Sequence, residues 1–133
     1  MKKRLLPFIV LLSLVFCIAM VNAQENAKKM PHPTMAMDNS AVDAILTAMK
    51  NQLGDDGKLS VLERVVKNNI DGIMVAQQLR LMNQFSTDDA KLECAKFLYP
   101  WSVDYKNYDK IKYNLATPVA QKALADYIKK KGK

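Results

Sequence analysis

The sequence predicts an all-α fold, a compact bundle of five or six short helices. Apolar residues recur every three or four positions through most of residues 40–130, the spacing that places them on one face of a helix. Capping residues, glycines and prolines separate these stretches, and no convincing run alternates apolar and polar residues as a strand would. We therefore predict a single helical domain over residues 40–130.

The first two helices are predicted from their starts and stops. Ser40, with Asp43 three residues later, suggests a capping box at the start of the first helix, and Gly54 is a natural stop. The second helix is expected from about Lys58 to Asn69. The inward faces predicted for these helices are Val42, Ile45, Leu46, Met49 and Leu53, then Leu59, Leu62, Val66 and Ile70.

Two central helices follow. Asp71, beside a glycine, can cap the third helix, which Phe85 closes. The polar residues 86–89 offer a start for the fourth, and Pro100 ends it because proline disfavours helical geometry in the residue before it. The inward residues predicted here are Val75, Leu79 and Met82, then Leu92, Ala95, Leu98 and Tyr99.

The last two helices complete the domain. Asp104 can cap the fifth, and Thr117 followed by Pro118 is a strong helix start, because proline suits the first helical position. Residues 131–133 form a basic tail. The inward residues predicted here are Tyr108, Ile111 and Leu115, then Ala120, Ala123, Leu124, Tyr127 and Ile128.

Residues 1–23 have the order of a secretory signal peptide. Basic residues at 2–4 precede an apolar run over 5–21, and a small-residue exit leads to predicted cleavage after Ala23. We therefore expect a secreted or periplasmic protein with no integral membrane span after cleavage.

Two alternatives to this signal peptide are weaker. A transmembrane anchor of roughly 17 residues would be short for a bilayer. A lipoprotein signal at Cys17 would place the bulky Phe16 where the peptidase favours a small residue.

One short stretch resembles a calcium-binding loop. Residues 55–63 read DDGKLSVLE. When Gly57 is placed at the glycine position of an EF-hand loop, Asp56, Ser60 and Glu63 fall at ligand positions. The two front ligand positions, however, hold a glutamine and a glycine. Too few oxygen ligands remain to strip water from the ion.

The same stretch has an echo. DDGKL at 55–59 returns as DDAKL at 88–92, 33 residues later, with alanine replacing the glycine that a calcium loop requires. A helix start loses nothing by that change, because aspartates in a first turn satisfy free N–H groups and complement the helix dipole. We predict helix capping, with weak Ca²⁺ binding as the alternative. The spacing also suggests two related helical hairpins plus a C-terminal helix.

The formal charge of +7 is concentrated at the two ends of the chain. Three positive charges leave with the signal, and four lysines lie within 129–133, so the body between them is close to neutral. No basic stripe interleaved with aromatics runs through the body, and nucleic acid is not an expected partner. The lysine tail is expected to be solvated, with weak, salt-dependent attraction to anionic lipid or polysaccharide as the alternative.

Residues 24–39 are predicted to be a flexible lead-in, because they contain two prolines and no sustained period. Met30, His32, Met35 and Met37 lie within it, and such soft ligands suit Cu(I). We favour a plain linker, with copper binding as the alternative.

An aromatic cluster surrounds the predicted break at Pro100. Tyr108 belongs to the inward stripe of the fifth helix, whereas Trp101 and Tyr105 are the better candidates for a partner-binding surface. Packing between the fourth and fifth helices is the alternative role for these rings.

Catalytic chemistry finds little support. Cys94 is the only cysteine after signal cleavage, so it can form no intramolecular disulfide and is expected to be a small buried hydrophobe. His32 lies outside the predicted domain, which leaves no Cys–His pair. The adjacent aspartates at 55–56 and 88–89 point in different directions on a helix and form no acid/base dyad. No catalytic residue, cofactor or metal site is predicted in the domain, and we expect no enzyme.

The segments DDGKLSVLERVV and QQLRLMNQFSTDDAKLECAKFLYPWSVDYKNYDKI resemble the family catalogued as domain of unknown function 4476. The resemblance covers about residues 55–130 and departs from the family's pattern at SVLERVV, where a more A-K-like helix is expected. The matching residues are Lys58-Leu59, Gln77, Gln78, Phe85, Lys91-Leu92, Ala95-Lys96, Tyr99-Pro100, Val103-Asp104 and Asn107-Tyr108.

The resemblance implies a helical domain of exported, mainly Bacteroidota proteins, with no assigned activity or cofactor. With the signal peptide, it favours an exported, non-enzymatic module that binds a protein or an envelope component. The alternative is an exported metal-binding protein, using Cu(I) at the lead-in or Ca²⁺ at residues 55–63.

Overall fold

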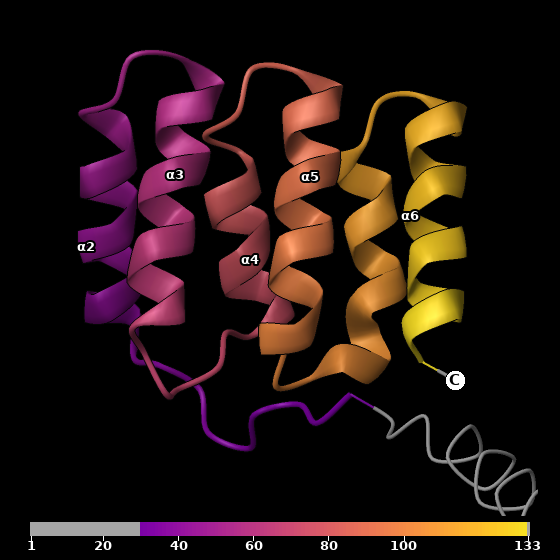
Figure 1. The fold of residues 1–133 in the computed structure, drawn as a ribbon, viewed down its shortest axis with the longest axis horizontal. Helices are drawn as coiled ribbons and strands as arrows, with labels where there is room; N and C mark the ends of the chain where they lie inside the picture. Colours follow the sequence, from indigo (N-terminus) through magenta and orange to yellow (C-terminus); the bar gives the residue numbers. More distant parts are fainter. Residues whose placement is uncertain (1–29, 133) are drawn as a thin grey trace, which may run out of the picture.

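The computed structural model describes residues 30–132 (Figure 1). It confirms the all-α fold, and no strand forms within that span. The predicted signal peptide and the start of the lead-in lie outside the described residues. The elements are α2 (Asn39–Lys50), α3 (Gly54–Lys67), α4 (Val75–Met82), α5 (Asp88–Leu98), the 3₁₀ helices η1 (Tyr99–Trp101) and η2 (Tyr105–Asn114), and α6 (Pro118–Lys131).

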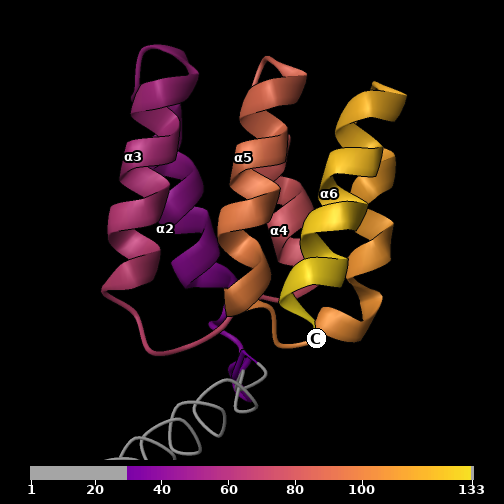
Figure 2. The same ribbon diagram turned by 45° about the vertical axis from the view of Figure 1, so that its right-hand side comes forward.

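The helices form a row of three antiparallel hairpins: α2 with α3, α4 with α5, and η2 with α6. Figures 1 and 2 show two layers, with α3, α5 and α6 in one and α2, α4 and η2 in the other. The segment predicted as a fifth helix is η2, a 3₁₀ helix that forms the third hairpin together with α6. All three hairpin turns lie along one edge of the row, which we call the turn edge.

The core runs between the two layers. Most inward residues predicted from periodicity are buried, among them Met49, Leu98 and Ile111. Others, such as Leu59 and Leu92, are half-buried, and only Leu53 and Ile70 among the predicted inward residues are exposed, at 98% and 93%. Both were assigned to helical stripes, but α2 ends at Lys50 and α3 at Lys67, so these two side chains belong to turns.

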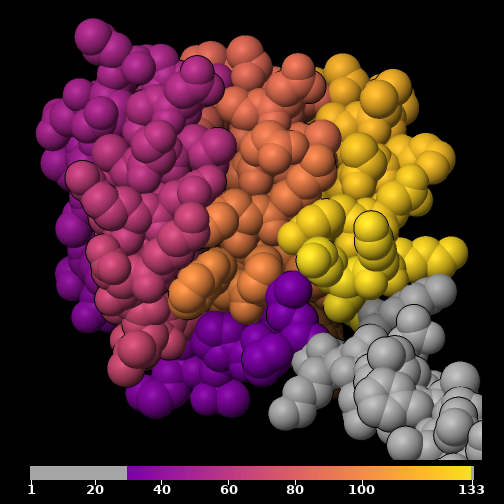
Figure 3. All heavy atoms as spheres, in the orientation of Figure 1, coloured from indigo at the N-terminus to yellow at the C-terminus, as the bar shows by residue number. Residues whose placement is uncertain are grey.

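The opposite edge of the row, which we call the linker edge, carries the segments that lead into the hairpins. Parallel bridges join Ala36 to Gly72 and Ile73 to Ser102. The N–H of Met37 donates to the Gly72 carbonyl at 2.8 Å, and its side chain is only 4% exposed. Contacts with the domain therefore begin before residue 40, and Figure 3 shows this indigo segment along the lower edge.

Helix starts differ from the predicted caps in three places: α2, α4 and η2. Asp38, not Ser40, caps α2, its carboxylate accepting from the Ala41 N–H at 2.8 Å. Asp71 does not cap α4; instead Gln77 accepts from the N–H of the N-cap residue Met74 at 3.0 Å. Asp104 makes no cap hydrogen bond to η2; its carboxylate instead accepts from the Val75 N–H at the start of α4, at 2.7 Å. The start of α6 agrees with the prediction, because the Thr117 hydroxyl accepts from the Ala120 N–H.

Two adjacent glutamines join the hairpins from inside. The Gln77 amide donates to the Met37 carbonyl at 3.1 Å and holds the segment before α2. The Gln78 amide is fully buried and donates to the Ser102 hydroxyl at 2.7 Å and to the Ile73 carbonyl at 3.1 Å. Buried donors persist when they are paired in this way, and these bonds help to fix the register of the central hairpin. The buried Oε1 of Gln78, by contrast, has no hydrogen-bond partner within residues 30–132.

Candidate functional site

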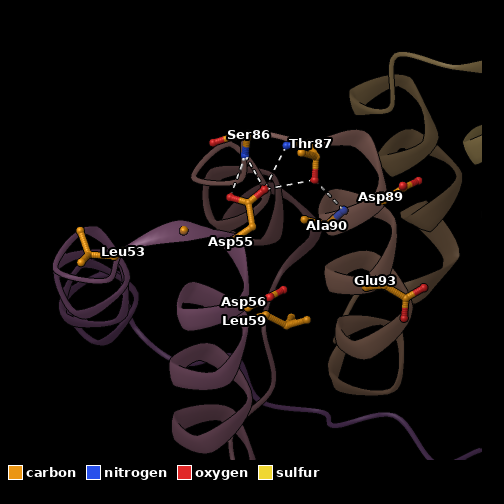
Figure 4. A pocket seen from close by; sticks show the side chains of 10 residues that line it. Leu53, Asp55, Asp56, Leu59, Ser86, Thr87, Asp89, Ala90 and Glu93 are labelled. Carbon is orange, nitrogen blue, oxygen red and sulfur yellow. Dashed lines mark hydrogen bonds between the residues drawn. The ribbon is translucent and has the colours of Figure 1, made fainter.

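Asp55 is the most heavily hydrogen-bonded carboxylate at the turn edge. It accepts from the N–H groups of Ser86 and Thr87, each at 3.0 Å, and from the Thr87 hydroxyl at 3.1 Å (Figure 4). Thr87 in turn caps α5. The predicted capping role is therefore correct in kind but wrong in target, because Asp55 in α3 binds the turn before α5 and not its own helix.

Asp88 repeats this arrangement one hairpin further along. Its carboxylate accepts from the N–H of Ala116 at 2.7 Å, and from the N–H and hydroxyl of Thr117 at 3.0 and 2.6 Å. We call each such contact an aspartate clasp. In the third hairpin Pro118 follows the capping threonine, so the side chain that would continue the series is missing there.

The clasps shift the acidity of both carboxyls. The hydroxyl and N–H of Thr117, together with the Ala116 N–H, lower the pKa of Asp88. Burial by itself would raise the pKa of Asp55, but the Ser86 and Thr87 donors outweigh it and the pKa is lowered. Both groups are therefore ionised at neutral pH and act as fixed acceptors.

A groove of about 600 Å³ opens beside the first clasp, between α3 and α5 (Figure 4). Leu59 and Ala90 are half-buried in it, and Leu53 stands exposed at its rim. Asp56 and Asp89 are exposed, and no ion pair to either forms among residues 30–132. The groove lining is Leu53, Gly54, Asp55, Asp56, Leu59, Ser86, Thr87, Asp89, Ala90 and Glu93.

The calcium-like stretch forms the start of α3. Both oxygens of Asp55 are occupied by N–H and hydroxyl donors, and Glu63 pairs with Lys67 at 2.9 Å. Within the described part of the chain, no group of three or more His, Cys, Asp or Glu residues is placed to hold a metal ion.

The side chains considered as copper ligands have different environments in the described part of the lead-in. His32 stacks on the Tyr105 ring, with centroids 4.0 Å apart, and meets Tyr99 edge-on at 5.1 Å. Met37 is in the core, whereas Met35 is 71% exposed. Gathering these side chains around one ion would require Met37 to leave the core.

Trp101 and Tyr105, the two residues proposed as a partner surface, are half-buried and pack against the core. Tyr105 is partly covered by His32, and the Trp101 carbonyl accepts from the Ile73 N–H at 2.8 Å. Tyr113, at 75% exposed, is the far more accessible ring. Periodicity did not single it out, because it lies at the end of η2, where the chain turns.

Cys94 is fully buried, as expected, and burial raises the pKa of its thiol. A thiol that stays protonated at neutral pH is a poor nucleophile and a poor metal ligand. Beside the same helix, the buried Tyr108 hydroxyl donates to the Ala95 carbonyl at 2.5 Å. Both side chains therefore serve packing.

Charge is unevenly distributed along the row. Residues 38–98, which contain the first two hairpins, carry nine acidic and seven basic residues. Residues 105–132, which form the third hairpin, carry two aspartates and seven lysines. Without the tail lysines at 129–131, the third hairpin still carries four lysines against two aspartates, so the near-neutral body predicted from the sequence is an average over an acidic part and a basic part.

None of the described helices is both long and apolar enough to cross a membrane. A family model described as "Domain of unknown function (DUF4476)" matches residues 36–128, more than half of the chain. Comparisons with curated proteins and with solved structures give no match.

Proposed function

Because the chain belongs to the DUF4476 family, whose description names no activity, we propose a function from the chain's own surface. The protein is an exported, non-enzymatic module that binds a basic, partly apolar segment of a partner protein. The binding surface is the groove between α3 and α5. The observation that carries this proposal is the pairing of apolar and acidic side chains in that groove.

The groove offers two kinds of contact. Leu53 at the rim is 98% exposed, and covering it would contribute about 2 kcal/mol. Asp56 and Asp89 supply negative charge on the two helices that border the groove. Charge of one sign beside apolar surface selects partners of the opposite sign and speeds their approach. A segment with lysines or arginines flanking one or two apolar residues matches both features.

The aspartate clasp keeps the groove in shape. Asp55 holds the turn at Ser86 and Thr87, so α3 and α5 are fixed relative to each other at the groove's upper end. A binding surface that is ordered in advance loses less conformational entropy when a partner binds. The ordered shape of the groove therefore supports its proposed role in binding a partner.

Export rests on the predicted signal peptide. We propose that the mature chain begins at Gln24, after cleavage at Ala23. The N-terminal sequence and the mass of the protein recovered from the producing cells test this directly, and an intact Met1 would contradict it.

Site-specific photo-crosslinking tests the groove. A photoreactive amino acid replaces Asp56 in the groove, and a matched variant carries it at Ala76, an exposed position on α4 in the other layer. In the producing cells, we expect a defined protein adduct from position 56 and none from position 76. The adduct is identified by mass spectrometry, and its crosslinked peptide should be basic.

Two results would contradict the proposal. Equal adducts from both positions would indicate non-specific contact, and an adduct whose crosslinked segment is acidic would contradict the charge argument. Asp89→Lys in the same background serves as a further check, because it should reduce the adduct at position 56 by reversing charge across the groove.

A further inference from the structure

We propose that the turn of the third hairpin docks on the anionic surface of a lipid bilayer. Tyr113, at the end of η2, is 75% exposed, and Val119, near the start of α6, is 80% exposed. They flank the loop that joins the two helices. Two large apolar side chains held in water on either side of one turn suit insertion among lipid headgroups, where aromatic rings are favoured.

Lysines accompany both side chains. The Lys112 ammonium lies 5.1 Å from the centre of the Tyr113 ring, and Lys110 is three residues before Tyr113 on the same 3₁₀ helix, where residues three apart share a face. On α6, Lys122 follows Val119 by one turn, and it pairs with Asp126 at 2.6 Å. The turn also holds the Asp88 carboxylate, which accepts from Ala116 and Thr117. With Asp126 it makes two aspartates against Lys110, Lys112 and Lys122, so the turn combines apolar side chains with a net positive charge.

Charge complementarity selects the lipid surface as the occupant. The third hairpin as a whole carries seven lysines against two aspartates. Each lysine brought close to an anionic membrane strengthens binding roughly fivefold at low salt. Three of these seven lysines, at 129–131, lie at the far end of α6 and contribute to the long-range attraction.

The other end of the turn edge provides a built-in contrast. Leu53 is 98% exposed there, but it neighbours Asp55 and Asp56. An anionic surface repels that neighbourhood, so only the third hairpin's turn is expected to approach lipid. This inference concerns a different surface from the groove and does not depend on the groove having a partner.

Vesicle co-sedimentation of the mature chain tests the proposal. One set of vesicles contains two parts phosphatidylcholine to one part phosphatidylglycerol, and the other contains phosphatidylcholine alone. We expect binding to the anionic vesicles at low salt that is at least tenfold stronger than to the neutral ones and that weakens as salt is raised.

Two matched double variants assign the binding surface. Tyr113→Ser with Val119→Ser should weaken binding to the anionic vesicles about tenfold, because it removes the inserting side chains. Leu53→Ser with Ile70→Ser removes two even more exposed apolar side chains elsewhere and should leave binding unchanged. Circular dichroism checks that both variants keep their helix content.

Three results would overturn the proposal. These are no binding to either kind of vesicle, equal binding to both kinds, and an equal loss in the two double variants. Binding to dextran sulfate without binding to vesicles would assign the lysines to an anionic polysaccharide and would also overturn it. None of these results bears on crosslinking at position 56, so this proposal and the groove proposal can fail separately.

Discussion

In each aspartate clasp, one carboxylate binds the N–H groups at a helix start and also joins two hairpins. Asp88 accepts two backbone N–H groups and one hydroxyl from the turn before α6. Those N–H groups lie at a helix start, where no intrahelical carbonyl is available to them. An ionised carboxylate can accept all three bonds at once, and hydrogen bonds to a charged acceptor are stronger than those between neutral groups.

Asp88→Asn should lower the free energy of unfolding at pH 7, because the amide NH₂ of asparagine would face the donors of Thr117. The folded-state pKa of Asp88 is lowered, so its contribution to stability is present above the unfolded-state pKa of about 4. That contribution is lost as the pH falls through the lower folded-state value. Urea unfolding at pH 7 and pH 3 should show the difference between wild type and variant shrinking at pH 3.

Asp89→Asn is the control for this measurement. Asp89 is the exposed neighbour of Asp88 and makes no hydrogen bond or ion pair through its side chain within residues 30–132. Its replacement should leave stability at pH 7 nearly unchanged. If the two variants lose the same stability at pH 7, the clasp contributes nothing beyond general charge.

Predictions for single residues fail where a side chain contacts residues that are distant in the sequence. The paired aspartates indicated capping, but their spacing could not reveal that the N–H donors belong to the next hairpin. Trp101 and Tyr105 follow a proline break, which favours exposure, but Trp101 packs against the core and His32 of the lead-in stacks on Tyr105. Burial of Cys94 was predictable, because its own helix places it among apolar neighbours.

At the scale of elements, the linker edge holds the hairpins in register. The N–H of Ile73 donates to the Trp101 carbonyl at 2.8 Å, and the N–H of Val103 donates to the Ile73 carbonyl at 3.2 Å. Gly72 sits where these segments approach most closely. A Cβ at this position would lie 2.6 Å from Val103 Cγ2, 2.7 Å from Pro33 Cβ and 2.8 Å from the Trp101 carbonyl oxygen.

Gly72→Ala should therefore reduce the free energy of unfolding by about 2 kcal/mol, as other overpacking substitutions do. Gly57→Ala is the matched control. Its Cβ would lie 3.3 Å from Gln52 Cβ, a contact that a shift of a few tenths of an ångström in the exposed turn relieves, and alanine suits a helix better than glycine. The control should be unchanged or up to about 1 kcal/mol more stable in urea unfolding. Equal losses in both variants would contradict the crowding at Gly72.

Helices were the most predictable elements because their apolar stripes are set by local periodicity. Their boundaries were less so: α3 begins at Gly54, four residues before the predicted start at Lys58. The segments of the linker edge show no sequence pattern from which their pairing could be predicted. Each of its segments contributes only one or two bridging residues, too few to produce the alternation by which a strand is recognised.

At the scale of the whole molecule, the domain begins earlier than residue 40. Met37 is buried, its N–H is paired with the Gly72 carbonyl, and Asp38 caps α2. The sequence suggested a flexible lead-in because prolines and methionines show no period. A segment that docks through the side chains of His32 and Met37 and two backbone hydrogen bonds leaves no such pattern.

A chain that starts at Ser40 should be about 3 kcal/mol less stable than one that starts at Gln24. Burial of Met37 contributes about 2 kcal/mol and the Asp38 cap about 1 kcal/mol. A chain that starts at Met30 should match the longer one. Urea unfolding of the three chains measures this, and equal midpoints for all three would show that the docked segment adds no stability.

The clasp series also determines how such a row could be lengthened. The stretch from Asp88 to Thr117 begins with an aspartate that accepts hydrogen bonds from the next turn along the chain. It ends with the threonine that donates them. A tandem duplication of this stretch would supply every new junction with both halves of the contact, while Pro118 would still close the final hairpin. Repeating these 30 residues would therefore lengthen the row of helices and keep an aspartate clasp at each new junction, by gene duplication or by design.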